Sequence, residues 1–166
     1  MSHAQHPLNI IDQIGPKLRA RELRDAFTAW SGGRLGHRLP GLVDIEGVAL
    51  SASPHMAVVE IEHGTHPLSF RFVQVGEHLA RRAPGPLLGR RIGGASPDAD
   101  MGDPLGSVAW AYRQCAISAK PSYEFADLDF GDGQPMLFER LLLPVGSGVV
   151  PSHVVVVSLF SESAEE

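Results

Sequence analysis

The chain is poor in the residues that build disulfide-stapled or cysteine-ligated folds. Its 166 residues include one cysteine, Cys115, which excludes an intramolecular disulfide framework and a zinc site made of clustered cysteines. No apolar run approaches the roughly 20 residues of a membrane-spanning helix. The first residues, MSHAQHPLNIIDQ, lack the basic and apolar segments of a secretory signal. We therefore expect a cytoplasmic protein with no membrane contact.

Basic residues are also fewer than acidic residues. The chain has 14 Lys and Arg against 19 Asp and Glu, which gives a formal net charge of -5. An acidic chain gains no long-range attraction to nucleic acid, and no basic patch has aromatic residues interleaved with it. Basic residues gather within 16–41 and acidic residues within 122–166. Such runs are typical of solvated faces, although complementary surfaces in a homodimer or with a partner remain the alternative.

Length and composition indicate a single globular domain. A chain of this size buries one sizeable core, and 43% hydrophobic with 20% charged residues is ordinary for a globular protein. Neither an internal repeat nor a second hydrophobic segment divides it. We expect a flexible N-terminus over 1–15, one domain over 16–160 and an acidic tail over 161–166.

The hydrophobic patterns predict an α+β fold with one antiparallel sheet. Helical spacing indicates helices over 16–31 and from Asp103-Pro104 to about Ala119, with short helical pieces between Gly76 and Gly94. Residues rich in β-branched and aromatic types predict strands. Helices inserted after the second of five strands do not form βαβ repeats, which favours an antiparallel sheet. The five predicted strands are 55–62, 68–75, 123–130, 137–145 and 153–160.

Two features orient the helices. The last strand, Val154 to Phe160, is apolar on both faces, so we expect it to be central and covered on both sides. The N-terminal helix is then predicted to cover the outer sheet face or a dimer seam. On the later helix, angular spacing points Tyr112 towards the sheet and Trp110 outwards or towards a partner. The expected interface residues are Leu23, Phe27, Trp30 and Trp110.

The element order and a set of short motifs resemble a PAS domain, and more specifically the PAS-like family of small stand-alone alphaproteobacterial proteins. The motifs span most of residues 20–160. The resemblance implies a five-stranded antiparallel sheet with short helices and one longer helix on one face, plus an N-terminal helix. It also implies a sensory or interaction module of bacterial signal transduction, without naming a ligand. The motifs are Trp30, Arg38-Leu39-Pro40, Asp44-Ile45, Phe70-Arg71-Phe72-Val73, Gly76, Leu88-Gly89-Arg90 and Glu139-Arg140-Leu141-Leu142-Leu143-Pro144.

We expect neither a cofactor nor a bound metal. Haem-binding PAS domains place an axial histidine on the long helix, and residues 104–119 contain none. Flavin and thioester chromophores need a reactive cysteine elsewhere than Cys115. His63 and His66 flank a turn with no third ligand nearby, which favours surface histidines. His78 is the remaining candidate ligand, in the short-helix region.

The sequence does not indicate catalysis. Ser107 lies outside any Gly-x-Ser-x-Gly elbow, and Cys115 has no activating neighbours. We therefore expect a non-enzyme that binds a small-molecule ligand or a signalling protein. The alternatives are a small α+β hydrolase or isomerase that uses Glu139 with Arg140, and a ligand-free structural adaptor.

A pocket between the sheet and the helices is the candidate binding site. Its alternative is a fully packed core, which composition does not distinguish. Arg71 is a candidate anion anchor, or it pairs with Glu60 across the hairpin. The candidate ligand-binding residues are Phe70, Phe72, Tyr112, Tyr123 and Phe125, together with Arg71.

Overall fold

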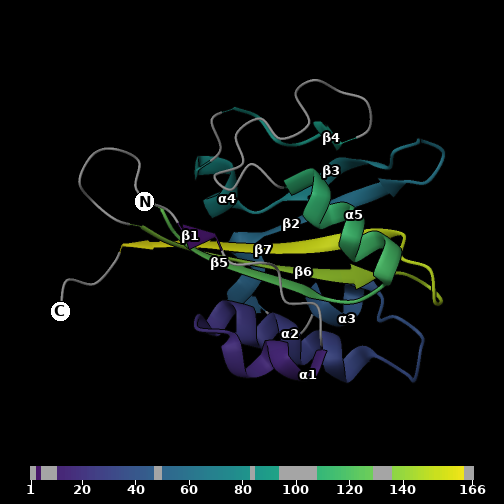
Figure 1. Cartoon of the computed structure of the whole chain (residues 1–166), viewed down its shortest axis with the longest axis horizontal. Coiled ribbons are helices and arrows are strands. Elements are labelled where there is room, and N and C mark those ends of the chain that lie inside the picture. Colours follow the sequence, from purple (N-terminus) through teal and green to yellow (C-terminus); the bar gives the residue numbers. More distant parts are fainter. Residues whose placement is uncertain are drawn as a thin grey trace.

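The computed structural model describes residues 3–4, 11–46, 50–82, 85–93, 108–128 and 136–162. They form an α+β fold in which helices lie on both sides of one antiparallel sheet (Figure 1). The sheet order is β1-β5-β6-β7-β2-β3-β4. The strands are β1 (His3–Ala4), β2 (Met56–Glu62), β3 (Ser69–Val75), β4 (Arg91–Gly93), β5 (Ser122–Leu128), β6 (Met136–Val145) and β7 (His153–Glu162). The helices are α1 (Ile11–Ile14), α2 (Arg21–Gly33), α3 (Leu42–Glu46), α4 (Glu77–Arg82) and α5 (Val108–Ser118), with 3-10 turns η1 (Gly15–Lys17) and η2 (Leu50–His55).

Within the described residues the sheet contains the five predicted strands and two that the sequence did not indicate, so it has seven strands there rather than the expected five. The additional strands lie at the two edges. β1 has two residues and pairs with β5, and β4 has three residues and pairs with β3. Neither is long enough to show the alternation that identifies a strand. The β2–β3 hairpin and the antiparallel class are as predicted.

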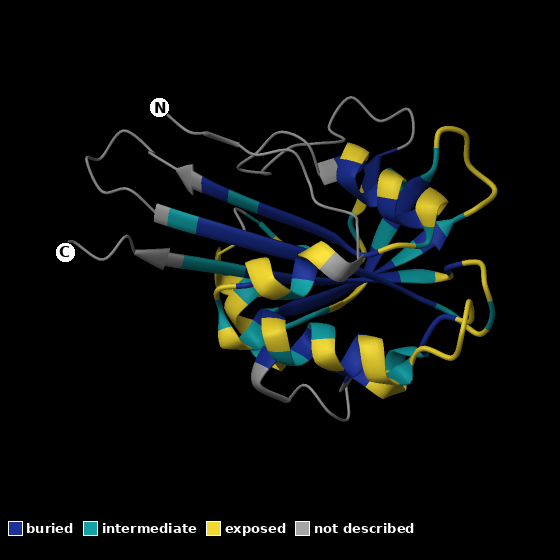
Figure 2. Cartoon of the chain, turned by 60° about the horizontal axis from the view of Figure 1, so that its bottom comes forward, coloured by how far each residue is buried: buried dark blue, intermediate teal, exposed yellow. Residues whose placement is uncertain are grey.

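β7 is central, as its two apolar faces predicted. It pairs with β6 on one side and β2 on the other, and both pairings are antiparallel. Val155 and Val157 enter the core on one face, whereas Val154 and Val156 enter the core on the other. Figure 2 shows the strands buried between helices whose outward sides are exposed.

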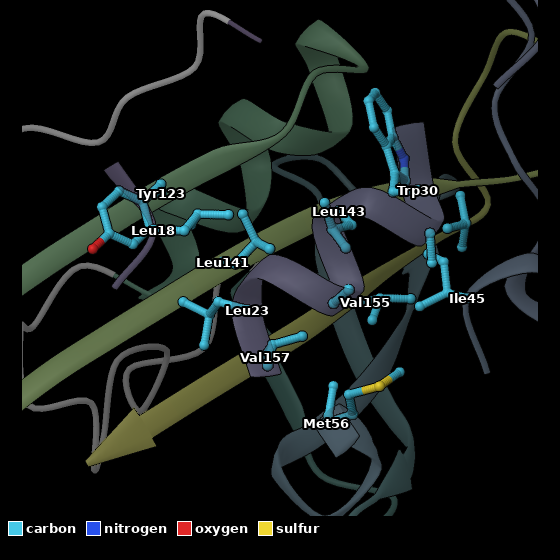
Figure 3. Packing of buried hydrophobic residues seen from close by; sticks show 14 of the residues in the cluster. Leu18, Leu23, Trp30, Ile45, Met56, Tyr123, Leu141, Leu143, Val155 and Val157 are labelled. Atoms are coloured by element: carbon cyan, nitrogen blue, oxygen red, sulfur yellow. The ribbon is translucent and has the colours of Figure 1, made fainter. Parts of the chain in front are cut away.

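One face of the sheet, which we call the α2 face, is covered by α1, α2 and α3. Side chains from α2 and α3 pack there on β6, β7 and the start of β2 (Figure 3). Trp30 is 1% exposed, and its indole Nε1 donates a hydrogen bond to the Pro144 carbonyl oxygen at 2.7 Å. The helix expected over 16–31 therefore covers the sheet, but it begins at Arg21, because Pro16 lies in the separate turn η1.

Residues before the expected domain start at 16 already belong to the fold. Residues 11–14 form α1, and the Ile14 side chain is fully buried in the core of the α2 face. The expected flexible N-terminus over 1–15 thus contains a packed segment. At the other end β7 continues to Glu162, two residues into the expected acidic tail, and residues 163–166 lie outside the described part.

The other face, the α5 face, is covered in part by α5. Tyr112 is 2% exposed and its ring meets the Phe70 ring edge to face at 5.4 Å between centroids. Trp110 is 45% exposed, so the predicted rotation of this helix is confirmed. The helix expected from Asp103-Pro104 is described from Val108, and residues 103–107 lie outside the described part.

Candidate ligand-binding pocket

The structure does not bring the six predicted ligand-binding residues into one pocket. Phe70, Phe72 and Tyr112 belong to the core of the α5 face. Tyr123 belongs to the core of the α2 face, and Phe125 packs against it. The sheet separates the two groups, because alternate residues of a strand point to opposite faces. The prediction that these aromatic residues line one pocket is therefore wrong, because they pack in two separate clusters.

Tyr123 has a specific role on the α2 face. Its hydroxyl donates to Glu139 Oε2 at 2.7 Å, and the backbone N–H of Arg19 donates to the same oxygen at 3.1 Å. Burial, followed by the Glu139 carboxylate, raises the pKa of Tyr123. The Arg19 guanidinium lies over the Phe125 ring at 4.2 Å. These contacts fasten the segment before α2 to β5 and β6, so they are structural.

Arg71 pairs across the hairpin, the second of its two predicted roles. Its Nη2 lies 3.1 Å from Glu60 Oε1, and both side chains are partly exposed. Residues 60 and 71 are direct partners in the β2–β3 ladder. Because this carboxylate already neutralises the guanidinium, the structure does not support an anion anchor at Arg71.

The expected interface residues also divide. Leu23 and Trp30 are buried against the sheet and Phe27 is partly buried, so they form intramolecular contacts. Trp110 and Ile117 are exposed on the outer side of α5, at 45% and 71%. Seven residues apart, they lie on one stripe of the helix.

The alternative enzyme site is not assembled. Glu139 contacts Tyr123 on the α2 face, whereas Arg140 forms a buried ion pair with Glu124 on the α5 face. Consecutive residues of β6 point to opposite sides of the sheet. Glu139 and Arg140 therefore cannot act on one substrate.

Candidate nucleophiles and metal ligands gain no support among the described residues. Cys115 is buried, and burial raises the pKa of its thiol, which disfavours the thiolate. His63 and His66 are exposed, and no group of three potential metal ligands occurs within the described ranges. Ser107 lies outside them.

A half-open pocket of about 340 Å³ lies at the end of the α5 face, between α4 and β7. We call it the α4 pocket. It combines an apolar wall with basic and imidazole side chains, which suits a small polar ligand. Of its lining residues, His78 was predicted as a candidate ligand, and Arg81 and Arg82 belong to a basic group in the middle of the sequence. Ser158 could have been recognised as a second lining residue, because it is a polar residue within the apolar run VVVVSLF. The lining residues are His55, His78, Leu79, Arg81, Arg82, Ser158 and Phe160.

A stack of two guanidinium groups and two aromatic rings begins in the pocket lining and continues along the sheet beyond it. The Arg82 guanidinium lies over the Phe160 ring at 5.2 Å, and the Phe160 and Phe138 ring centroids are 4.9 Å apart. Arg140 follows at 5.5 Å from the Phe138 ring and is held by the buried carboxylate of Glu124. Such stacking orders side chains that would otherwise be mobile. The wall is therefore preorganised.

His55 and His78 meet at the pocket. Nδ1 of His78 lies 3.2 Å from Nε2 of His55, and the two rings meet edge to face. The corner before α4 holds them together, because the Gly76 N–H donates to the Met56 carbonyl oxygen at 2.7 Å. A Cβ on Gly76 would approach the Pro54 carbonyl oxygen to 2.6 Å, so only glycine fits this corner.

The pH dependence of stability should report on His55. Burial lowers its pKa from 6.5, the charge of His78 lowers it further, and Glu22 on α2 opposes both effects. Since the unfolded chain binds this proton more readily, stability is full above pH 6.5 and falls as the pH drops below it towards the lower folded pKa. Urea unfolding across this window should show a shallower loss for His55→Gln than for the parent. Equal slopes in the two proteins would contradict this assignment.

In comparisons with known proteins, no family model matches the chain and no curated protein matches it. Among the described residues, none of the helices is both long and apolar enough to cross a membrane.

Proposed function

We propose that the chain is a non-catalytic PAS-like module of bacterial signal transduction that binds a small molecule in the α4 pocket. The pocket itself, half open beside a sheet that is otherwise well packed in its described part, carries the proposal. The element order supports the PAS-like assignment. β2 and β3 are followed by α4, the short edge strand β4 and the longer helix α5, and then by β5, β6 and β7.

The lack of an assembled catalytic group supports a binding role. Within the described residues the carboxylate of Glu139 is used by Tyr123 and Arg19, and the Cys115 thiol is buried. Output from such a module would pass through a protein partner or a second copy of the chain. The exposed stripe of Trp110 and Ile117 on α5 is the surface we assign to that contact.

Occluding the pocket tests the binding role. We expect the purified full chain to retain a small molecule in native mass spectrometry, or to be stabilised by a member of a metabolite library. Ser158→Phe places a ring in the pocket and should abolish both effects, whereas Thr28→Phe on the exposed side of α2 should abolish neither.

His78→Trp, at the exposed rim, is a second blocking variant in case Ser158→Phe disturbs the strand. Circular dichroism would verify that each variant folds. A parent protein that carries no ligand, is stabilised by none, and becomes more stable when the pocket is filled would contradict the proposal and favour the adaptor.

A further inference from the structure

The α4 pocket is basic. Among its described lining residues are Arg81, Arg82, His55 and His78, and none of those lining residues is acidic. Lining of this kind favours a ligand that carries negative charge.

The acidic side chains that the structure describes near the pocket do not cancel this positive charge. Glu77 reaches Arg81 at 3.6 Å, but both side chains are about two-thirds exposed, so the pair is weak. Glu22, on α2, acts on His55 from outside the lining. Glu124 is occupied by Arg140, which lies 2.7 Å from it.

The histidine pair supplies directed hydrogen-bond donors. One nitrogen of each ring is used in the contact between them. Within the described part of the chain the other two, Nδ1 of His55 and Nε2 of His78, have no hydrogen-bond partner. When both rings are neutral, the pair offers one outward N–H. The ring that donates its only hydrogen within the pair has no hydrogen on its other nitrogen. A singly protonated pair offers two, with the shared hydrogen between the rings.

We infer that the α4 pocket binds the oxyanion of a small molecule, a carboxylate or a phosphate, between the His55–His78 pair and the Arg81 guanidinium of α4. The remainder of the ligand would lie on the Phe160 ring. Charge-assisted hydrogen bonds to an oxyanion are about twice as strong as neutral ones. The inference rests on the proposed function and names its ligand class.

Binding should take up a proton. An oxyanion stabilises the doubly donating, protonated pair, so its affinity rises as the pH falls. Among the described residues, α4 places Arg81 and Arg82 in the pocket lining, with Glu77 paired to Arg81, and Glu22 of α2 acts on His55, while β7 contributes the uncharged Ser158 and Phe160.

Two small anions that keep their charge near neutral pH test the inference on the full chain. Acetate represents a carboxylate, sulfate represents the tetrahedral shape of a phosphate, and acetamide is the uncharged match for acetate. Ring resonances of the histidines would be followed by NMR at constant ionic strength. We expect acetate or sulfate to shift those of His55 and His78, with affinity about tenfold higher near pH 6 than near pH 7.5.

Variants separate the pair from general charge attraction. His78→Gln should weaken anion binding about tenfold and remove most of its pH dependence, whereas His37→Gln, at an exposed position elsewhere, should change neither. Arg81→Gln should weaken binding several-fold without altering the pH dependence. Acetate alone would assign a carboxylate, and sulfate alone a phosphate.

The outcomes distinguish this inference from the proposed function. The inference that the ligand carries an oxyanion would be overturned by either of two results. One is that acetamide shifts the histidine resonances as much as acetate does, and the other is that anion affinity is unchanged in His78→Gln. If an uncharged molecule binds the parent and Ser158→Phe blocks it, the binding role stands and the oxyanion is wrong. If the anion affinity of Ser158→Phe equals that of the parent, the anion does not bind in the α4 pocket, and the inference is wrong.

Discussion

Replacing Trp30 by alanine is expected to lower the free energy of unfolding by about 3–5 kcal/mol. The indole is 1% exposed within the core of the α2 face, and the Phe27 ring stacks near it with centroids 6.3 Å apart. The substitution removes this buried area, leaves a cavity and deprives the Pro144 carbonyl oxygen of its donor. Urea unfolding at 25 °C, followed by circular dichroism, would measure the change.

The second tryptophan of the chain is the matched control. Trp110 is 45% exposed on α5, so Trp110→Ala should cost less than about 1 kcal/mol. Sedimentation of the same variant would show whether this residue contributes to self-association. Trp30→Phe keeps most of the apolar area and loses the hydrogen bond to Pro144, which should cost about 1–3 kcal/mol. Equal losses from the two alanine variants would show that α2 does not pack as described.

Breaking the buried ion pair beneath the α4 pocket is the other large effect. Glu124 and Arg140 are each 3% exposed as side chains, and Nε and Nη2 of Arg140 lie 3.2 and 2.7 Å from one Glu124 oxygen. Glu124→Gln removes the negative charge that Arg140 contacts at 2.7 Å, while its guanidinium stays buried. Since removing one partner of a buried ion pair is strongly destabilising, we expect a loss of about 3–5 kcal/mol in the free energy of unfolding.

Two comparisons isolate the cause. Glu77→Gln removes an exposed partner of Arg81 and should cost less than about 1 kcal/mol. The double variant Glu124→Leu/Arg140→Met removes both charges and should recover most of the stability lost in Glu124→Gln, because a buried pair is often matched by apolar residues of similar size. A double variant as unstable as the single one would show that packing, rather than the loss of the Glu124 charge beside Arg140, sets the cost.

The sequence by itself determined the five longer strands, the two longer helices and the orientation of several of them. Alternation identified the β2–β3 hairpin, and the run Val154 to Val157 placed β7 at the centre of the sheet, where both of its faces are buried. Helical spacing placed Tyr112 inwards and Trp110 outwards on α5. These features are local, because the periods of 2 and 3.6 residues separate the faces of a single strand or helix.

Only the tertiary structure decided which faces of different strands meet. Phe70 and Tyr123 each lie on the apolar side of their own strand, yet strand pairing places them on opposite sides of the sheet. Arg140 finds Glu124 rather than its neighbour Glu139 for the same reason. The alternation of side chains between the two faces of a strand can be seen in each segment of the sequence. The register between distant strands, and the contact of His55 with His78, depend on pairing and packing across the whole chain.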